Sequence, residues 1–377
     1  MAQPLRTFVV CPSWPDADTY IYAEGGEGSA LINGASVSMP ASVKAARKAT
    51  KPVVLSGLGD IQGISAAEGS WSSTCQTPGT EFALPIADAS RARVTLYNPD
   101  PNPAAVDLQL LGDEGPIQAP GTRGVIVPAM STRELALNPI VPSGSLVVAG
   151  STSQGRIMAV ANHPAEVGGV AASATTPIAT EVVIPGPQPK GKHKLIIGNP
   201  GDAETTAQVV VFGTSAPFTP VGTDEIDIPA KASVSIDMTA PLSDQPGAIQ
   251  VSALAPVTAA VATQTSKGMA IRTGSMAERN LEGFVWPKAK GSLQLANPSE
   301  QDITATVSVA GQDKDVLVPA KSSVDTPVGA GLIAVKANEP VYGAMLVGVK
   351  GASWMPLTPK RATPEPLQIN LDARTGR

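Results

Sequence analysis

Two cysteines, Cys11 and Cys75, are the residues of this sequence whose chemistry is open to the most different uses. Each could be a reactive thiol, a buried free thiol or one half of a disulfide. A reactive thiolate needs a nearby base or a helix N-terminus that lowers its pKa, and neither surrounds these cysteines. We therefore expect a disulfide between them, with two free buried thiols as the alternative. The disulfide would stabilise the fold by about 4 kcal/mol and would indicate an exported protein.

The remaining groups that could do chemistry are dispersed. His163 and His193 are the only histidines, and each is predicted near a strand end as an exposed polar residue. Close carboxylates occur in three predicted turns, namely Asp16 with Asp18, Asp224 with Glu225 and Asp227, and Asp313 with Asp315. Their spacing is not that of an EF-hand loop, so solvated turns are expected, with Ca²⁺ binding as the alternative. No nucleophile, zinc or phosphate-loop motif is present, and we predict no catalytic residue, cofactor or metal site.

Aromatic side chains are scarce, with five Phe, four Tyr and four Trp in the chain. A sugar-cleaving cleft is usually lined by aromatics around two carboxylates, and no such lining is evident. Trp71, Trp286 and Trp354 fall at predicted unit boundaries, where we expect them to be buried. Trp14, in the loop after Cys11, is the best candidate for an exposed ligand contact.

An Asn-Pro motif shows how these residues are positioned. Five of the ten asparagines precede proline, and three of those pairs lie in one context. Each follows a short apolar strand and precedes a polar turn and a second alternating strand; the three stretches begin at Arg93, Lys194 and Ser292. Proline cannot donate a ladder hydrogen bond and ends the strand, while the asparagine side chain can bond nearby backbone to shape the turn.

A second marker follows each of these stretches. The sequences are Val-Ile-Val-Pro-Ala at Val125, Ile-Asp-Ile-Pro-Ala at Ile226 and Val-Leu-Val-Pro-Ala at Val316. A pair of apolar strands then closes each repeat, and the period is about 100 residues. The N-terminal part fits the same template less well, with Cys11 placed where the other copies carry Asn. The expected units are 1–79, a divergent first copy, then 80–180, 181–282 and 283–359, followed by a mobile tail at 360–377.

Bulk composition agrees with an all-β fold. Apolar residues make up 42% of the 377 residues, and the 36 Gly and 36 Pro indicate many short strands between turns. We predict four tandem β-sandwich units of immunoglobulin-like or fibronectin-like type in an elongated array. A β-propeller is the architectural alternative and ranks lower, because its blades usually span ~40–50 residues, half the observed period.

The charge and hydropathy patterns limit the partners. A net charge of −5 with dispersed cations offers no basic face for nucleic acid. The one basic run, Lys44 to Lys51, is expected to be solvated surface, with an anionic partner as the alternative. No apolar run approaches the ~18 residues that span a bilayer, and the first residues hold no signal core. The chain is therefore either cytoplasmic or exported with its signal or anchor outside this sequence, and the expected disulfide favours export.

The ordered markers resemble an actinobacterial family known as domain of unknown function 5719. The resemblance is carried by "VCPSWP" at Val10, by "STCQTPGTEFALP" at Ser73 and by the stretch from Val94 to Ala129, and it continues more loosely through the later repeats. It implies an extracytoplasmic protein anchored by an N-terminal transmembrane helix, and a role in the cell envelope near glycosyltransferases. It brings no catalytic residues.

These observations together predict a non-enzymatic extracytoplasmic scaffold or accessory protein of the bacterial cell envelope. It would act through contacts with an envelope or membrane protein, such as glycosyltransferase or transport machinery, while tethered by a segment absent from this chain. The alternative is a glycan-binding or adhesive surface protein whose partner is a cell-wall glycan.

Overall fold

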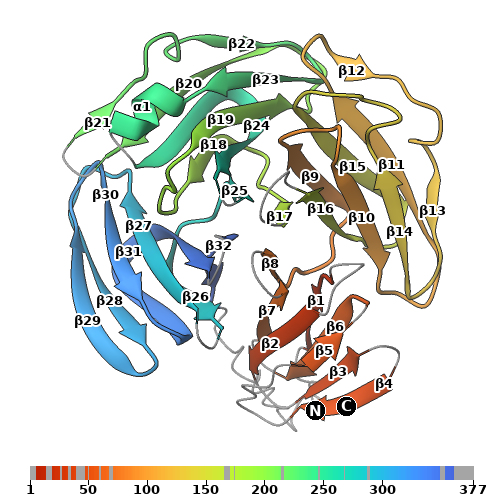
Figure 1. Cartoon of the computed structure of the whole chain (residues 1–377), viewed down its shortest axis with the longest axis horizontal. Helices are drawn as coiled ribbons and strands as arrows, with labels where there is room; N and C mark the ends of the chain where they lie inside the picture. Colours follow the sequence, from red (N-terminus) through yellow and green to blue (C-terminus); the bar gives the residue numbers. More distant parts are fainter. Residues whose placement is uncertain are drawn as a thin grey trace, which may run out of the picture.

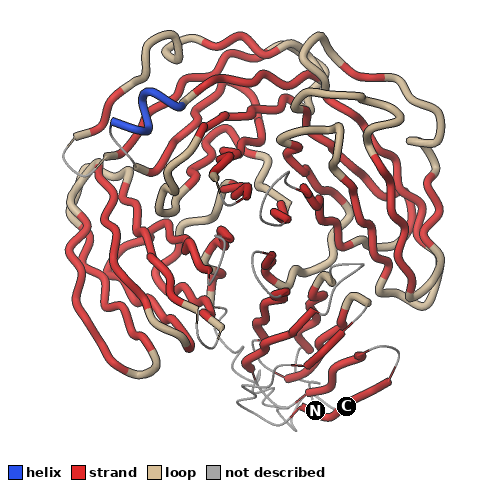
Figure 2. Tube along the Cα trace, in the orientation of Figure 1, coloured by secondary structure: helices blue, strands red, loops and turns tan. Residues whose placement is uncertain are grey.

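The computed structural model describes residues 6–13, 19–25, 28–32, 35–39, 47–49, 51–58, 61–67, 71–164, 170–173, 175–213, 216–244, 247–266, 268–286, 289–348 and 353–360. These residues form antiparallel strands and one short helix (Figures 1 and 2), so the all-β prediction is confirmed. The strands fall into four successive groups, named here groups 1 to 4.

Group 1 contains β1 (Arg6–Cys11), β2 (Thr19–Gly25), β3 (Gly28–Ile32), β4 (Ala35–Met39), β5 (Arg47–Ala49), β6 (Val53–Leu58), β7 (Ile61–Ala67) and β8 (Trp71–Thr74). Group 2 contains β9 (Glu81–Ile86), β10 (Arg93–Asn98), β11 (Ala104–Leu111), β12 (Pro116–Ile117), β13 (Val125–Val127), β14 (Ser131–Ala136), β15 (Leu146–Gln154), β16 (Met158–Pro164) and β17 (Val170–Ser173).

Group 3 contains β18 (Ala179–Ile184), β19 (Lys192–Asn199), β20 (Thr205–Phe212), β21 (Pro217–Phe218), β22 (Ile226–Ile228), β23 (Ala232–Asp237), α1 (Thr239–Asp244), β24 (Ala248–Thr265) and β25 (Gly268–Thr273). Group 4 contains β26 (Glu278–Val285), β27 (Lys290–Asn297), β28 (Ile303–Val309), β29 (Gln312–Val318), β30 (Ser322–Val328), β31 (Gly331–Gly348), β32 (Ser353–Pro356) and β33 (Thr358–Pro359).

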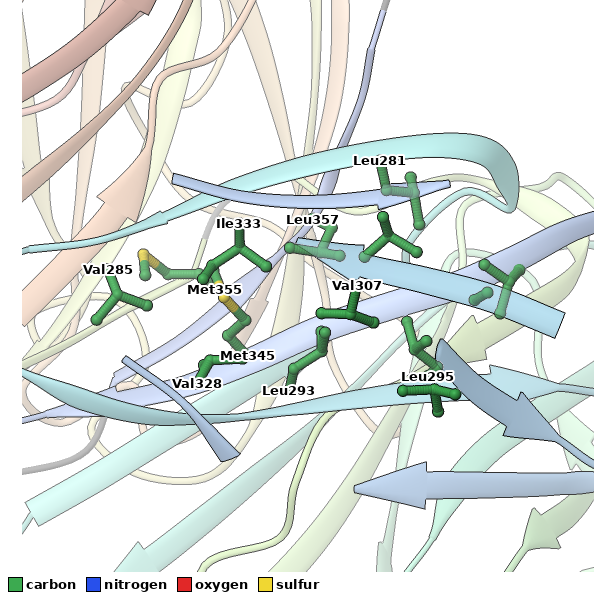
Figure 3. Packing of buried hydrophobic residues seen from close by; sticks show 14 of the residues in the cluster. Leu281, Val285, Leu293, Leu295, Val307, Val328, Ile333, Met345, Met355 and Leu357 are labelled. Carbon is green, nitrogen blue, oxygen red and sulfur yellow. The ribbon is translucent and has the colours of Figure 1, made fainter. Parts of the chain in front are cut away.

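The strand order repeats from group to group. Group 1 has sheets β1-β6-β3-β4 and β5-β2-β7-β8, and group 2 has β9-β15-β11-β12 and β14-β10-β16-β17. In groups 3 and 4 one long strand, β24 or β31, supplies a strand to both sheets and joins them into one eight-stranded sheet. In groups 1 and 2 the two sheets, and in groups 3 and 4 the two halves of the eight-stranded sheet, enclose an apolar core between them; Figure 3 shows the core of group 4.

The Asn-Pro motif is a buried clamp that recurs with the same geometry in groups 2, 3 and 4. Asn199 is 0% exposed, and its amide nitrogen lies 2.8, 3.2 and 3.1 Å from the carbonyl oxygens of Ala203, Ile228 and Pro229. Its Oδ1 accepts a hydrogen bond from the backbone of Gly201 at 2.9 Å. Asn98 and Asn297 make the corresponding contacts. The two sequence markers are thus tied to each other, because the asparagine bonds the strand that carries the Val-Pro or Ile-Pro pair.

The four groups lie in a ring rather than in the predicted elongated array. Figure 1 shows them around a central axis, and the inner strands β8, β17, β25 and β32 contact one another in turn around it. The ring closes between the first and last groups, where the Ser72 backbone donates to Ser353 Oγ at 3.0 Å. The elongated array is therefore wrong. Sheets set around an axis are a feature shared with β-propellers, although the strand order here is not sequential within a sheet.

Strands buried on both faces explain the ring. Leu195, Ile196 and Ile197 in β19 are all 0% exposed. Leu195 and Ile197 face the core of group 3, whereas Ile196 packs against Val147 and Leu111 of group 2. A sheet that is apolar on both faces must be covered on both, so each group requires a neighbour on each side.

Matched serines fasten two of the junctions between groups. Ser233 of β23 donates from its backbone to Gly112 O at 2.7 Å and from its hydroxyl to Leu111 O at 2.7 Å. Ser323 of β30 bonds the corresponding carbonyls of group 3, those of Gly213 and Phe212. Buried hydrogen bonds of this kind fix the register of neighbouring sheets as well as adding stability.

Candidate functional site

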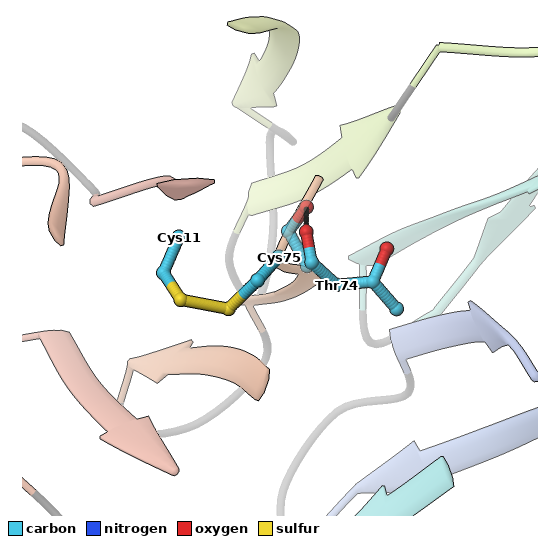
Figure 4. The surroundings of a disulfide bond; sticks show 4 residues. Cys11, Thr74 and Cys75 are labelled. Atoms are coloured by element: carbon cyan, nitrogen blue, oxygen red, sulfur yellow. Dashed lines mark hydrogen bonds between the residues drawn. A yellow bond between two sulfur atoms is a disulfide. The ribbon is translucent and has the colours of Figure 1, made fainter. Parts of the chain in front are cut away.

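The predicted disulfide is present between Cys11 and Cys75 (Figure 4). Cys11 is fully buried among Val9, Val53 and Leu55. Next to it, Val10 and Gln76 exchange two backbone hydrogen bonds of 2.7 and 2.8 Å. The bond therefore fastens the first strand of group 1 to the segment that leaves its last strand. A structural disulfide indicates an oxidising, extracytoplasmic compartment.

The expectation that Cys11 replaces the motif asparagine is wrong. Asn98 ends β10, a strand paired with β14 and β16, and the group 1 strand with that place is β2, paired with β5 and β7. Cys11 ends β1, which corresponds to β9, β18 and β26 at the inner end of the other sheet. Cys11 and Asn98 are similar in sequence context because each ends a strand and is followed by proline and a polar loop.

The histidines are buried, so their predicted exposure is also wrong. His193 is 2% exposed; its Nε2 accepts from Gln188 Nε2 at 3.1 Å, which leaves Nδ1 to donate to Thr263 Oγ1 at 2.9 Å. Burial, with the positive charge of Arg272, lowers the pKa of His193 to about 4. Burial likewise lowers the pKa of His163 to about 4. Both imidazoles are neutral at pH 7, and both ring nitrogens of His193 are used in the fold.

The tryptophans and clustered carboxylates that the sequence singled out lie in different environments. Trp354 is 5% exposed and donates from Nε1 to Pro185 O at 2.9 Å, and Trp286 packs half-buried on the group 4 core. Trp14, Asp16, Asp18 and the side chain of Trp71 lie outside the described residues. The carboxylates of Asp224, Glu225, Asp227, Asp313 and Asp315 are exposed. Within the described part of the chain, no three His, Cys, Asp or Glu side chains gather to hold a metal ion.

A cleft of about 670 Å³ lies between groups 2 and 3. We call it the junction cleft. Group 2 contributes Ala87, Asp88, Ser143 and Gly144, and group 3 contributes the start of β19, the end of β23 and the β24–β25 hairpin. This volume is in the range of ligand pockets. Sequence reasoning did not find the cleft, because its residues come from five separated segments.

Alternation along β19 determines what the cleft presents. Successive strand residues point to opposite faces, so Lys192 and Lys194 are exposed on the cleft side while the His193 side chain is turned inward. Lys194 Nζ donates to Ser145 Oγ at 3.1 Å. Asp237 is opposite Lys194 in the β19–β23 register. Hydrogen bonds from Thr239, followed by weaker attraction to nearby positive charge, lower the pKa of Asp237.

A buried polar network links group 3 to group 4 beyond the cleft. Arg272, 0% exposed, donates to Gly186 O at 2.9 Å and to Gln188 Oε1 at 3.2 Å. Gly186 N donates to Gln294 Oε1 at 3.0 Å, and Gln294 in turn donates to Asp325 at 2.8 Å. Burial lowers the pKa of Arg272 to about 10 and raises that of Asp325. Arg272 therefore stays charged at neutral pH and fixes the Gly186–Gln188 segment of group 3, from which Gly186 bonds Gln294 of group 4.

The fold and these contacts define an all-β protein built from repeated antiparallel sheets, and its disulfide indicates an extracytoplasmic compartment. The chain belongs to the family of unknown function DUF5719, whose model matches residues 31–326. Comparison with curated proteins finds none that matches. In the described residues, no helix is long and apolar enough to cross a membrane.

Similarity to solved structures is slight. A cycloalternan-forming enzyme from Listeria monocytogenes is 10% identical, with a TM-score of 0.21, over 89% of this chain and 29% of the enzyme. A Ca²⁺-stabilised ice-binding adhesin from an Antarctic bacterium is 11% identical, with a TM-score of 0.13, over 93% of this chain and 98% of the adhesin. A tetra-tandem repeat from the extending region of a large adhesion protein has a TM-score of 0.09 and 11% identity, over 95% of this chain and 100% of that one. Scores this low carry no conclusion.

Proposed function

We propose that this protein is a non-enzymatic extracytoplasmic scaffold or accessory protein of the bacterial cell envelope, tethered to the cytoplasmic membrane and acting through protein–protein contacts. The observation that carries the proposal is the ring itself. Its buried polar groups, which include both histidines, Arg272 and the three clamp asparagines, lie within the groups or at their junctions. These buried hydrogen bonds make the ring rigid, and a rigid ring suits a scaffold that presents its loops and strand edges to partner proteins.

The compartment and the family give further support. The Cys11–Cys75 disulfide favours an oxidising location, and the family resemblance implies an envelope protein with a membrane anchor. We further propose that each group is an immunoglobulin-like or fibronectin-like sandwich unit, since each has two facing antiparallel sheets of about the size of such units. The unit boundaries at 79, 180, 282 and 359 stay predictions.

Cross-linking in intact cells tests the scaffold role. The tagged protein, expressed from its natural gene, is cross-linked and purified, with an unrelated exported β protein as the control. We expect one or a few envelope or membrane proteins, such as a glycosyltransferase or a transport component, to be enriched. Each must then bind the purified chain directly. Enrichment of no envelope protein above the control would refute the proposal.

A further inference from the structure

We propose that the junction cleft binds a neutral saccharide of about two sugar residues. This inference does not depend on the scaffold role, and it rests on the shape of the cleft, its charge balance and a comparison between two junctions of the same ring. The comparison is possible because groups 3 and 4 repeat the same strand pairing.

The junction between groups 3 and 4 is filled where the junction between groups 2 and 3 is open. In group 4 the inner strand β32 places Trp354 opposite Leu346 of β31, and the indole covers Gly186 of the preceding group. In group 3 the corresponding position of β25 carries Ile271, opposite Ala262 of β24. An isoleucine and an alanine occupy less volume than a tryptophan and a leucine. Space therefore remains beside Ala262 and Met269, and both residues line the cleft.

The charges around the cleft balance. Lys192 and Lys194 bring two positive charges, and Asp88 and Asp237 bring two negative ones. The carboxylates would repel a polyanion, and the ammonium groups would repel a polycation. A charged ligand would also have to remove water from the lining groups of its own sign without pairing them, which is costly. A saccharide hydroxyl both donates and accepts hydrogen bonds, so it suits a lining that mixes strong donors with strong acceptors.

Uncharged groups complete the match. The hydroxyls of Ser143, Ser235 and Thr239 add donors and acceptors, and Gln264 adds its amide oxygen, since its amide nitrogen donates to the carbonyls of Thr265 and Gly268 within the hairpin. Ala87, Ala262, Ile236 and Met269 supply apolar surface. Sugar rings present hydroxyls at their edges and C–H groups on their faces. The polar groups would therefore fix the orientation of the ligand, and the apolar groups would contact its C–H face.

The test uses the whole chain and ligand-observed NMR with titration calorimetry. The neutral probes are maltose, cellobiose, lactose and N,N′-diacetylchitobiose, and the charged probes are digalacturonic acid and chitosan disaccharide. We expect at least one neutral probe to bind with a Kd of about 1 mM or tighter. Met269→Trp, which fills the cleft, should weaken that binding at least about tenfold. Met276→Trp, at a residue 61% exposed outside the cleft lining, should leave it unchanged.

A second variant keeps the test decisive if the tryptophan disturbs folding. Gln264→Ala removes the amide oxygen that Gln264 offers to a ligand and should weaken binding about fivefold, the loss expected for about one hydrogen bond. It also removes the two bonds that the amide nitrogen makes within the hairpin, so circular dichroism checks that the variant is folded. Failure of all neutral probes to bind would overturn the proposal. So would binding of charged probes alone, or neutral-probe binding that Met269→Trp and Gln264→Ala both leave intact.

Discussion

Replacing a clamp asparagine should be among the most damaging polar substitutions in this protein. Asn199→Ala removes an amide that donates to Ala203, Ile228 and Pro229 carbonyls and an oxygen that accepts from Gly201 N. The amide has two hydrogens, so the loss is equivalent to about three good hydrogen bonds. At about 1 kcal/mol each, the free energy of unfolding should fall by about 3 kcal/mol.

Urea unfolding followed by circular dichroism measures this change. Asn138→Ala is the matched control, because Asn138 also precedes proline but is exposed, and it should change stability by less than about 0.5 kcal/mol. Asn98→Ala and Asn297→Ala should resemble Asn199→Ala, since the three clamps share one geometry. If Asn199→Ala is as stable as Asn138→Ala, the clamp does not hold the repeat together.

Three further predictions concern the disulfide, a junction and pH. Reducing the Cys11–Cys75 bond, or replacing both cysteines with serine, should speed amide exchange in β8 and β32 where the ring closes; unchanged exchange would show that the bond does not support closure. Ser233→Ala removes the buried hydrogen bond from its hydroxyl to group 2 and should lower the free energy of unfolding in urea by about 1–2 kcal/mol. Ser235→Ala, at an exposed residue of the same strand, is the control and should leave that free energy unchanged. Burial lowers the pKa values of His193 and His163 to about 4, so the unfolded chain binds these two protons more tightly and the free energy of unfolding falls as pH drops from 6.5 toward 4. His193→Gln should remove about half of that histidine contribution and leave the half due to His163, and an unaltered slope would contradict this reasoning.

The sequence predicted the repeat well because the repeat is local. The Asn-Pro and the Val-Pro or Ile-Pro markers lie 29 residues apart in groups 2 and 3 and 21 apart in group 4, and their strand context identifies them. The clamp that joins them follows from the need to satisfy buried backbone at a proline turn. The disulfide could be predicted for a different reason: two cysteines with no neighbouring base to lower their pKa have few chemical roles other than a disulfide.

The ring and the cleft could not be predicted in this way. Closure depends on contacts such as that between Ser72 and Ser353, which are 281 residues apart and leave no periodic pattern. One signal was nevertheless present: continuous apolar runs such as Leu195–Ile197 indicate strands covered on both faces. The cleft is lined by residues of five separated segments, which only the folded arrangement of groups 2 and 3 brings together.

Small-angle X-ray scattering tests the closed ring most directly. A compact chain of this length should have a radius of gyration of about 21 Å, with a pair-distance distribution that falls smoothly to zero. Four compact units of about 95 residues placed end to end would give about 40 Å and a long tail in that distribution. A value near 21 Å supports the ring that the structure shows, and a value near 40 Å would contradict it.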